Sequence, residues 1–198
     1  MPQGRALATQ QRILAAAGEL FAQHGYAETS LAEIESAAGV SRATLHHHFP
    51  SKPAVADAVL SHQHAVLVAP DDPIRLQALI TLTRTYATAL QTDPVLRGAV
   101  RLATEPGRYM TTEPYQGPIN AVAALLSEAR LRGELLPGVD PARSARFITA
   151  AYTGTQMLSQ ATTGRDDLQD LITLMWQHVL PALAHPAMLP VLHITPDH

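Results

Sequence analysis

Residues 41–48, Ser-Arg-Ala-Thr-Leu-His-His-His, carry the side chains whose types and spacing suggest chemistry. Hydroxyl, guanidinium and imidazole groups form hydrogen bonds with phosphate oxygens and with the edges of bases. The histidines at positions 46–48 do not form a metal site, because consecutive residues of a helix point about 100° apart and cannot converge on one ion. We therefore expect these residues to recognise nucleic acid, and we expect no metal.

Two short helices separated by a glycine turn must position these side chains. Ser30 and Glu33 match a capping box, which predicts a helix that starts at Leu31. Gly39 ends this helix, and Ser41 is a favourable N-cap for a second one. The pattern is typical of a helix-turn-helix unit, whose second helix reads the major groove with its N-terminal residues. The residues expected to contact DNA are Ser41, Arg42, Ala43, Thr44, His46, His47 and Lys52.

The overall charge does not itself indicate a nucleic-acid partner. The 198 residues have a formal net charge of −3. Before residue 53 the acidic and basic residues balance: they are Arg5, Arg12, Arg42 and Lys52 against Glu19, Glu28, Glu33 and Glu35. We expect the two signs to lie on different faces, with few phosphate contacts per subunit and a modest dependence of affinity on salt.

The composition indicates a folded chain with a sizeable core. Apolar residues make up 46% of the sequence and charged residues 16%. No apolar run approaches the roughly 20 residues that span a bilayer, and residues 1–10 lack the apolar segment of a signal peptide. The sequence has no cysteine, which agrees with a reducing compartment. The expected location is the cytoplasm.

The sequence gives little support for catalysis. It contains no phosphate-binding glycine loop, no nucleophile elbow and no HExxH motif. The acid pairs Asp71-Asp72 and Asp166-Asp167 fall at the ends of predicted helices, where capping and solvation explain them. We expect no catalytic residues and no cofactor, and predict that the chain is not an enzyme.

Apolar periodicity and capping signals predict an all-α fold of about nine helices. The helices are expected at 9–24, 31–38, 42–46, 52–66, 74–90, 94–105, 119–132, 142–161 and 166–184. Residues 1–8 are expected to be a disordered arm and residues 105–118 a loop, because the latter contain three prolines and two glycines. The predicted domains are a helix-turn-helix domain at 1–50 and a ligand-binding and dimerisation domain at 51–184, followed by a flexible tail at 185–198.

The first third of the chain resembles the TetR family of bacterial repressors. The resemblance includes the two short helices, the Gly25-Tyr26 turn and a set of flanking residues. These residues are Ile13, Ala17, Leu20, Phe21, Thr29, Leu45, His48, Phe49, Ser51 and Lys52. It implies an N-terminal three-helix DNA-binding domain, followed by a helical ligand-binding domain. The sequence departs from the family at His46, where a tyrosine that contacts a DNA phosphate is usual.

Residues 93–107, DPVLRGAVRLATEPG, resemble one branch of that family, the γ-butyrolactone receptors of actinomycetes. Members of this branch repress genes of secondary metabolism until a lactone, furan or butenolide binds. By this resemblance, Gln63 and Thr155 line the ligand cavity. A tryptophan that stacks on the ligand in many receptors corresponds to Pro118 here.

The remaining ligand contacts are expected on apolar helix faces that surround one cavity. With the two residues above, the predicted set is Gln63, Leu79, Leu82, Tyr86, Leu96, Val100, Leu125, Tyr152, Thr155 and Gln156. The two C-terminal helices, Ala142 to Ala161 and Asp166 to Ala184, are more apolar than one neighbouring layer can cover. Together with the resemblance, this predicts a homodimer in which two copies of these helices form a bundle, and Trp176 is expected in its core.

Two alternatives remain open from the sequence. One is a related DNA-binding regulator that binds antibiotics, or no ligand, in place of a lactone; the missing tryptophan favours it. The other is a helical enzyme or interaction module that has kept the dimer bundle and lost DNA binding. The predicted function is a ligand-responsive repressor that binds double-stranded operator DNA.

Overall fold

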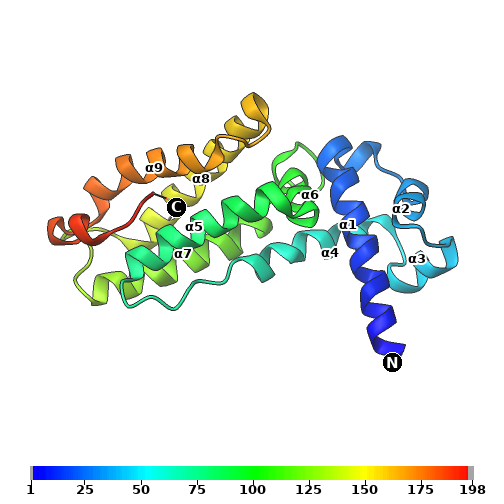
Figure 1. Cartoon of the computed structure of the whole chain (residues 1–198), viewed down its shortest axis with the longest axis horizontal. Helices are drawn as coiled ribbons and strands as arrows, with labels where there is room; N and C mark the ends of the chain where they lie inside the picture. The colour runs from blue at the N-terminus through cyan, green and yellow to red at the C-terminus, as the bar shows by residue number, and fades with distance from the viewer. Residues whose placement is uncertain (1, 196–198) are drawn as a thin grey trace. The chain divides into compact units, whose positions relative to one another are not determined.

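The computed structural model describes residues 2–195, with side chains from residue 4 onward, and it is all-helical over this range (Figure 1). The α-helices are α1 (Pro2–Glu28), α2 (Leu31–Ala38), α3 (Arg42–His48), α4 (Lys52–Val66), α5 (Arg75–Thr92), α6 (Pro94–Thr104), α7 (Glu113–Leu131), α8 (Pro141–Thr163) and α9 (Leu168–Leu183). A 3₁₀-helix, η1 (Pro186–Val191), follows. No strand occurs among the described residues, so the predicted all-α class is confirmed.

The helices begin and end where local capping chemistry dictates. The Asp93 side chain accepts hydrogen bonds from the amides of Val95 and Leu96 at the start of α6, with Pro94 in the first turn. Asp140 and Pro141 start α8 in the same way. Because a proline in the first turn lacks only an amide that would be unbonded anyway, this start is favourable.

Three predicted segments are wrong. Helix α1 starts at Pro2, so residues 2–8 are helical; Met1 lies outside the described residues. The predicted loop at 105–118 ends at residue 112, since α7 begins at Glu113 and contains Pro118. Pro114 lies in the first turn, where it costs little, and Pro118 removes one helical hydrogen bond. Residues 185–195 of the predicted tail form η1 and an ordered segment; residues 196–198 lie outside the described part.

The chain divides into two compact units that are not continuous in sequence. Unit 1 comprises Met1–Val66 and Thr92–Pro114, and unit 2 comprises Leu67–Gln91 and Tyr115–His198. Unit 1 therefore contains α6 as well as α1–α4. Its core is built around Ile13, Phe21, Ile34 and Leu45, none of which is exposed. The predicted functional boundary at residue 50 concerns roles rather than packing and stays a prediction.

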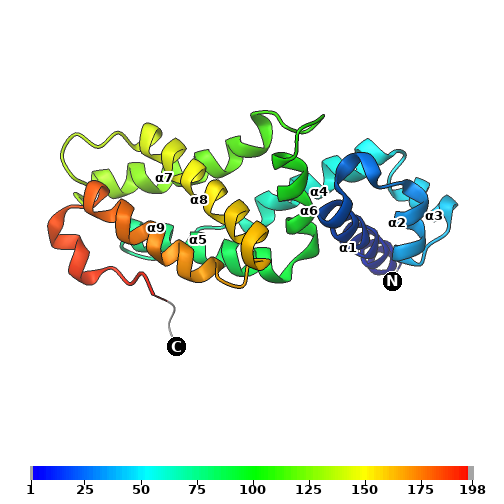
Figure 2. The ribbon, with the colours of Figure 1, turned by 90° about the horizontal axis from the view of Figure 1, so that it is seen from above.

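In unit 2, α8 and α9 run side by side (Figures 1 and 2). Trp176 is fully buried, and its indole N–H donates to Thr83 Oγ1 over 2.8 Å. The expectation that Trp176 belongs to a dimer core is therefore wrong, because α5 already covers it within the same chain.

The carboxylate of Glu134 accepts from the amides of Arg75 and Leu76, at 3.0 and 2.8 Å, and so caps α5.

Candidate functional site

Helices α2 and α3 form the predicted two-helix unit, and its capping contacts are present. The amide of Glu33 donates to Ser30 Oγ over 3.2 Å, and the Glu33 carboxylate accepts from the amide of Ser30 over 2.7 Å. Gly39 ends α2 with φ of 61° and ψ of 42°, a left-handed conformation that glycine adopts without strain. The amide of Thr44 donates to Ser41 Oγ over 3.2 Å and starts α3. The turn therefore follows from local sequence chemistry.

Helix α3 separates its buried residues from its exposed ones. Leu45 is fully buried and Phe49, just beyond the helix, is 5% exposed. Because these two residues are four apart, they face the unit 1 core together, and His46 and His47 between them are exposed. The predicted DNA contacts Ser41, Arg42, Ala43, His46 and His47 are exposed, and Thr44 is half-buried. Arg42 and His46, four apart, share one exposed side of the helix.

Lys52 is placed differently from the other predicted DNA contacts. Its ammonium donates to the carbonyl of Ala27 over 3.2 Å and lies 4.3 Å from the centre of the Tyr26 ring. Both partners lie in the last turn of α1, just after the kink at Gly25. Lys52 therefore joins the start of α4 to the end of α1, and its contact with DNA stays a prediction.

The predicted ligand residues are divided between the two units. Gln63, Leu96 and Val100 lie in unit 1, whereas Leu79, Leu82, Leu125, Tyr86, Tyr152, Thr155 and Gln156 lie in unit 2. In unit 2, the rings of Tyr86 and Tyr152 meet edge to face with centres 5.8 Å apart. Burial raises the pKa of both phenols, so both remain protonated at neutral pH. The Tyr152 hydroxyl donates to the carbonyl of Thr83 over 3.2 Å.

The three polar residues expected to orient a ligand have different surroundings. Gln156 is 3% exposed, and its carbonyl oxygen accepts from Arg165 Nη2 over 3.1 Å. It thereby holds the α8–α9 connection, where Arg165 has a positive φ of 78°. Thr155 is half-buried. Gln63, in unit 1, is 5% exposed. Their contact with a ligand stays a prediction.

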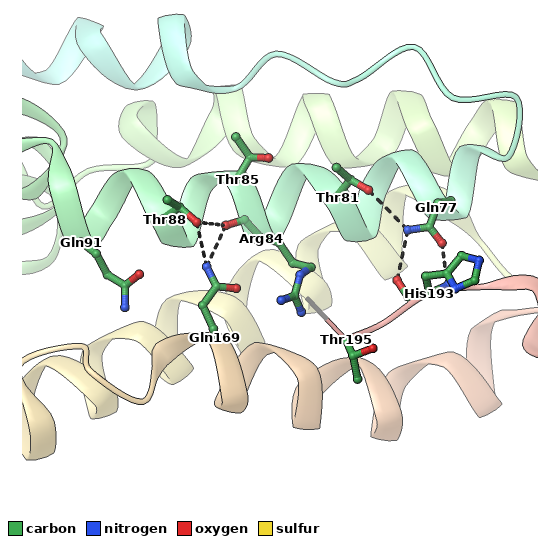
Figure 3. Close-up of a pocket in the computed structure, with 9 residues that line it drawn as sticks. All are labelled: Gln77, Thr81, Arg84, Thr85, Thr88, Gln91, Gln169, His193 and Thr195. Carbon is green, nitrogen blue, oxygen red and sulfur yellow. Dashed lines mark hydrogen bonds between the residues drawn. The ribbon is translucent and has the colours of Figure 1, made fainter. Parts of the chain in front are cut away.

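A polar pocket of about 380 Å³ lies in unit 2, between α5, α9 and the C-terminal segment (Figure 3). It is lined by Gln77, Thr81, Arg84, Thr85, Thr88, Gln91, Gln169, His193 and Thr195. None of these residues belongs to the predicted ligand set. The signal in the sequence was the polar stripe on α5, whose members recur at helical spacing from residue 77 to residue 91.

Many of the groups in this pocket bind one another. The side chain of Gln77 donates to the carbonyl of His193 over 3.1 Å and accepts from its amide over 2.8 Å (Figure 3). Arg84 donates to the carbonyl of Ile194 over 2.8 Å. Gln169 donates to the Thr88 hydroxyl over 2.9 Å. The contacts of Gln77 and Arg84 bind the C-terminal segment to α5, and the contact of Gln169 joins α9 to α5. The pocket is therefore the place where the C-terminal segment docks.

The chain is all-helical over the described residues, and α3 exposes small and basic residues beside a capped glycine turn. These features are those of a helix-turn-helix DNA-binding protein. The sequence model for "Bacterial regulatory proteins, tetR family" matches residues 13–59. The A-factor receptor protein of Streptomyces griseus is 35% identical over 98% of this chain and 70% of the receptor. The chain belongs to the TetR family. It is a DNA-binding transcriptional regulator and not an enzyme.

Solved structures share the fold along nearly the whole chain. The full-length TetR regulator TylP from Streptomyces fradiae is 38% identical, with a TM-score of 0.88 over 96% of this chain and 93% of that chain. A γ-butyrolactone receptor described as an ArpA-like protein is 26% identical, with a TM-score of 0.76 over 92% of both chains. Among the described residues, no helix combines the length and apolar character that crossing a membrane requires.

Proposed function

We propose that the chain is a dimeric repressor that binds operator DNA through α3 and is released by a small lactone, furan or butenolide. The observation that carries this proposal is the 35% identity to the A-factor receptor protein over 98% of the chain, which includes both units and not only the helix-turn-helix. A second support is the fold shared with a γ-butyrolactone receptor. By analogy, the ligand binds in the helical part after residue 51, and the repressor controls genes of secondary metabolism.

The proposed operator contacts lie at the start and on the outer side of α3. They are the exposed residues Ser41, Arg42, Ala43, His46 and His47, the half-buried Thr44, and Lys52 at the start of α4. The N-terminal position of residues 41–44 suits the reading of base edges in the major groove. Arg42 supplies a guanidinium, which can bind a guanine or a phosphate through two hydrogen bonds. His46 stands where the family usually has a tyrosine that contacts a phosphate, and its imidazole N–H can donate to a phosphate oxygen.

The proposed dimer interface is the apolar stripe along α8, with a contribution from α9. On α8, Phe147 is 63% exposed and Leu158 is 59% exposed, and Gly154 lies between them. Spacings of seven and four residues put all three on one side of the helix. Leu174 of α9 is also exposed. A palindromic operator requires two α3 helices about 34–36 Å apart, the spacing of successive major grooves, and a second copy bound at this stripe would supply the second α3.

Release by a ligand sets an energetic requirement. Shifting a population from about 1% to about 99% released requires a preference of about 5.5 kcal/mol for the released form, or half of that from each of two sites. The binding free energy from burying a lactone and its alkyl chain, together with a few hydrogen bonds from residues such as Gln63 and Thr155, is of this size.

The decisive experiment is a mobility shift on duplexes from the protein's own promoter region. The expected result is a retarded band that a synthetic γ-butyrolactone, furan or butenolide abolishes at micromolar concentration. If the band forms and neither these compounds nor extracts of the producing organism release it, the ligand assignment is wrong. If no duplex is retarded, operator binding itself is wrong.

A second candidate is a regulator of the same fold that responds to another class of compound, or to none. Two observations favour it. Pro118 stands where a stacking tryptophan is common, and it lies inside α7. The pocket described in unit 2 is lined by polar side chains and none of the predicted ligand residues. Release of the band by an antibiotic, and not by lactones, would establish this candidate.

A further inference from the structure

Helix α6 packs against α1 in unit 1 without an intervening layer of side chains. Where α6 crosses α1, Gly98 faces Gly18: a Cβ on Gly98 would lie 2.5 Å from the carbonyl oxygen of Gly18. A Cβ on Gly18 would lie 2.5 Å from the carbonyl oxygen of Pro94. Both distances are far below van der Waals contact, so only glycine fits at either position. The two backbones touch, and α6 cannot shift toward α1 without moving it.

The C-terminal end of α6 binds the last turn of α1, just before α2. Glu105, the C-cap of α6, accepts a hydrogen bond from the amide of Tyr26 over 2.7 Å. Gly25, one residue before, has φ of 75° and interrupts the helical backbone of α1. A carboxylate from a residue 79 positions away thus binds the amide at this kink. Arg101 Nε donates to the same carboxylate over 3.1 Å and orients it.

The N-terminal end of α6 is fastened to α4 and joined closely to α5. One carboxylate oxygen of Asp93 caps α6, and the other lies 2.6 Å from His62 Nε2 on α4. Helix α5 ends at Thr92 and α6 begins at Pro94, so Asp93 alone separates them. By contrast, α4 and α5 are joined by residues 67–74, which are not helical. The connection from α5 to α6 is therefore the shorter of the two and leaves the chain less freedom.

We propose that Glu105 is the positioning residue through which α6 fixes the orientation of the helix-turn-helix. In this proposal, a displacement of α5 moves α6 through Asp93. The displaced α6 then shifts Tyr26 through the Glu105 contact and so changes the orientation of α2 and α3. Helix α4 contributes through His62 rather than acting alone. The inference rests on the proposed function, since it names the route by which an event in unit 2 changes operator binding.

Hydrogen exchange on the full-length protein tests the proposal without knowledge of the ligand. The variants are Glu105→Ala, Glu105→Gln, His62→Ala and the double variant His62→Ala/Glu105→Ala. Glu113→Ala, which removes an exposed carboxylate of the same unit, is the control. Exchange is followed at Tyr26 and across α2 and α3, and the affinity for a duplex that the wild type retards is measured in parallel.

Glu105→Ala is expected to speed exchange at Tyr26 and throughout α2 and α3 by about tenfold and to weaken operator binding by a similar factor, because a charge-assisted hydrogen bond is lost. Glu105→Gln keeps an acceptor oxygen and is expected to restore most of the slow exchange and most of the operator affinity. If the alanine variant fails to fold, Glu105→Gln is measured in its place. His62→Ala is expected to speed exchange at Tyr26 when Glu105 is present, and to add nothing in the double variant.

The proposal is overturned if Glu105→Ala affects the Tyr26 amide alone and leaves α2, α3 and operator affinity at wild-type values; Glu105 would then only cap a turn. It is also overturned if the effects of His62→Ala and Glu105→Ala are independent. Failure of the proposed function is a separate outcome: the wild type would retard no duplex, and the exchange measurements would still decide the role of Glu105.

Discussion

Arg42 is an exposed cation at the first position of α3, where a helix-turn-helix protein reaches the bases. We predict that Arg42→Ala weakens operator binding by about 1–3 kcal/mol if the guanidinium reads a guanine. If it contacts a phosphate instead, affinity falls for all duplexes alike and the slope of log affinity against log salt falls by about 1. Fluorescence anisotropy on specific and scrambled duplexes over a range of salt concentrations separates the two cases.

The matched control for Arg42 is Arg130→Ala, which removes an exposed arginine from α7 and changes the net charge equally. Its affinity for the operator is expected to equal that of the wild type. Equal weakening by both substitutions would mean that Arg42 acts only through net charge and that α3 is not the reading helix.

Glu19 joins α1 to α6 through a bond of 2.7 Å to Arg97 Nη2. The hydrogen bond from Arg97, with a second from Gln23, lowers the pKa of this carboxyl below its ordinary value of 4.5. A lowered folded-state pKa adds stability above the unfolded pKa, and this stability is lost as the pH falls through the folded value.

Glu19→Gln is therefore predicted to reduce the free energy of unfolding at pH 7 by less than about 1 kcal/mol, since the pair is largely solvated. The difference from the wild type should persist down to about pH 5 and narrow below the ordinary pKa of a glutamate. Urea denaturation at pH 7, 5 and 4 measures it. A difference that grows toward acid pH contradicts the proposed ion pair.

At the scale of elements, what could be predicted from the sequence is what local chemistry decides. The capping box of Ser30 and Glu33 and the aspartate–proline starts at Asp93 and Asp140 act within a few residues, and all three are present. From such local patterns the all-α class, the two-helix unit and the exposed face of α3 could be predicted.

Contacts between distant residues could not be predicted in this way. That Gln63, Leu96 and Tyr86 line one cavity stays a prediction, since the first two lie in unit 1 and the third in unit 2. The Glu105–Tyr26 contact left no local signal, because neither residue has a pattern that indicates the other. The tail was expected to be loose since its prolines exclude an α-helix, but its backbone groups are bound by side chains of α5.

The C-terminal segment is an element whose docking can be tested. Gln77→Ala removes both hydrogen bonds to His193, and we predict a loss of about 1–2 kcal/mol in unfolding free energy. Exchange of the His193 amide should approach that of an unprotected group. Thr85→Ala, on the same helix and in the same pocket, is the control and should leave His193 protected. Equal protection in Gln77→Ala would show that other contacts hold the segment.

At the scale of the whole molecule, function requires two copies of α3 at a fixed separation, and the exposed apolar stripe of α8 is the proposed means. Phe147 and Leu158 are large apolar side chains that the single chain leaves in water. Because the folded interior already contains Trp176, Met175 and Ile172, the stripe contributes little to the stability of one protomer. It can therefore be changed without unfolding the chain.

Phe147→Glu is predicted to convert the dimer to a monomer, since two carboxylates would be buried opposite an apolar surface without partners. Sedimentation velocity should show the change in mass, while circular dichroism keeps the helical signal. Operator affinity should fall by orders of magnitude, because one half-site then binds alone. Leu131→Glu places the same charge on an 84% exposed leucine of α7 and should stay dimeric. If Phe147→Glu also remains a dimer that binds the operator, the two-fold interface lies elsewhere on the molecule.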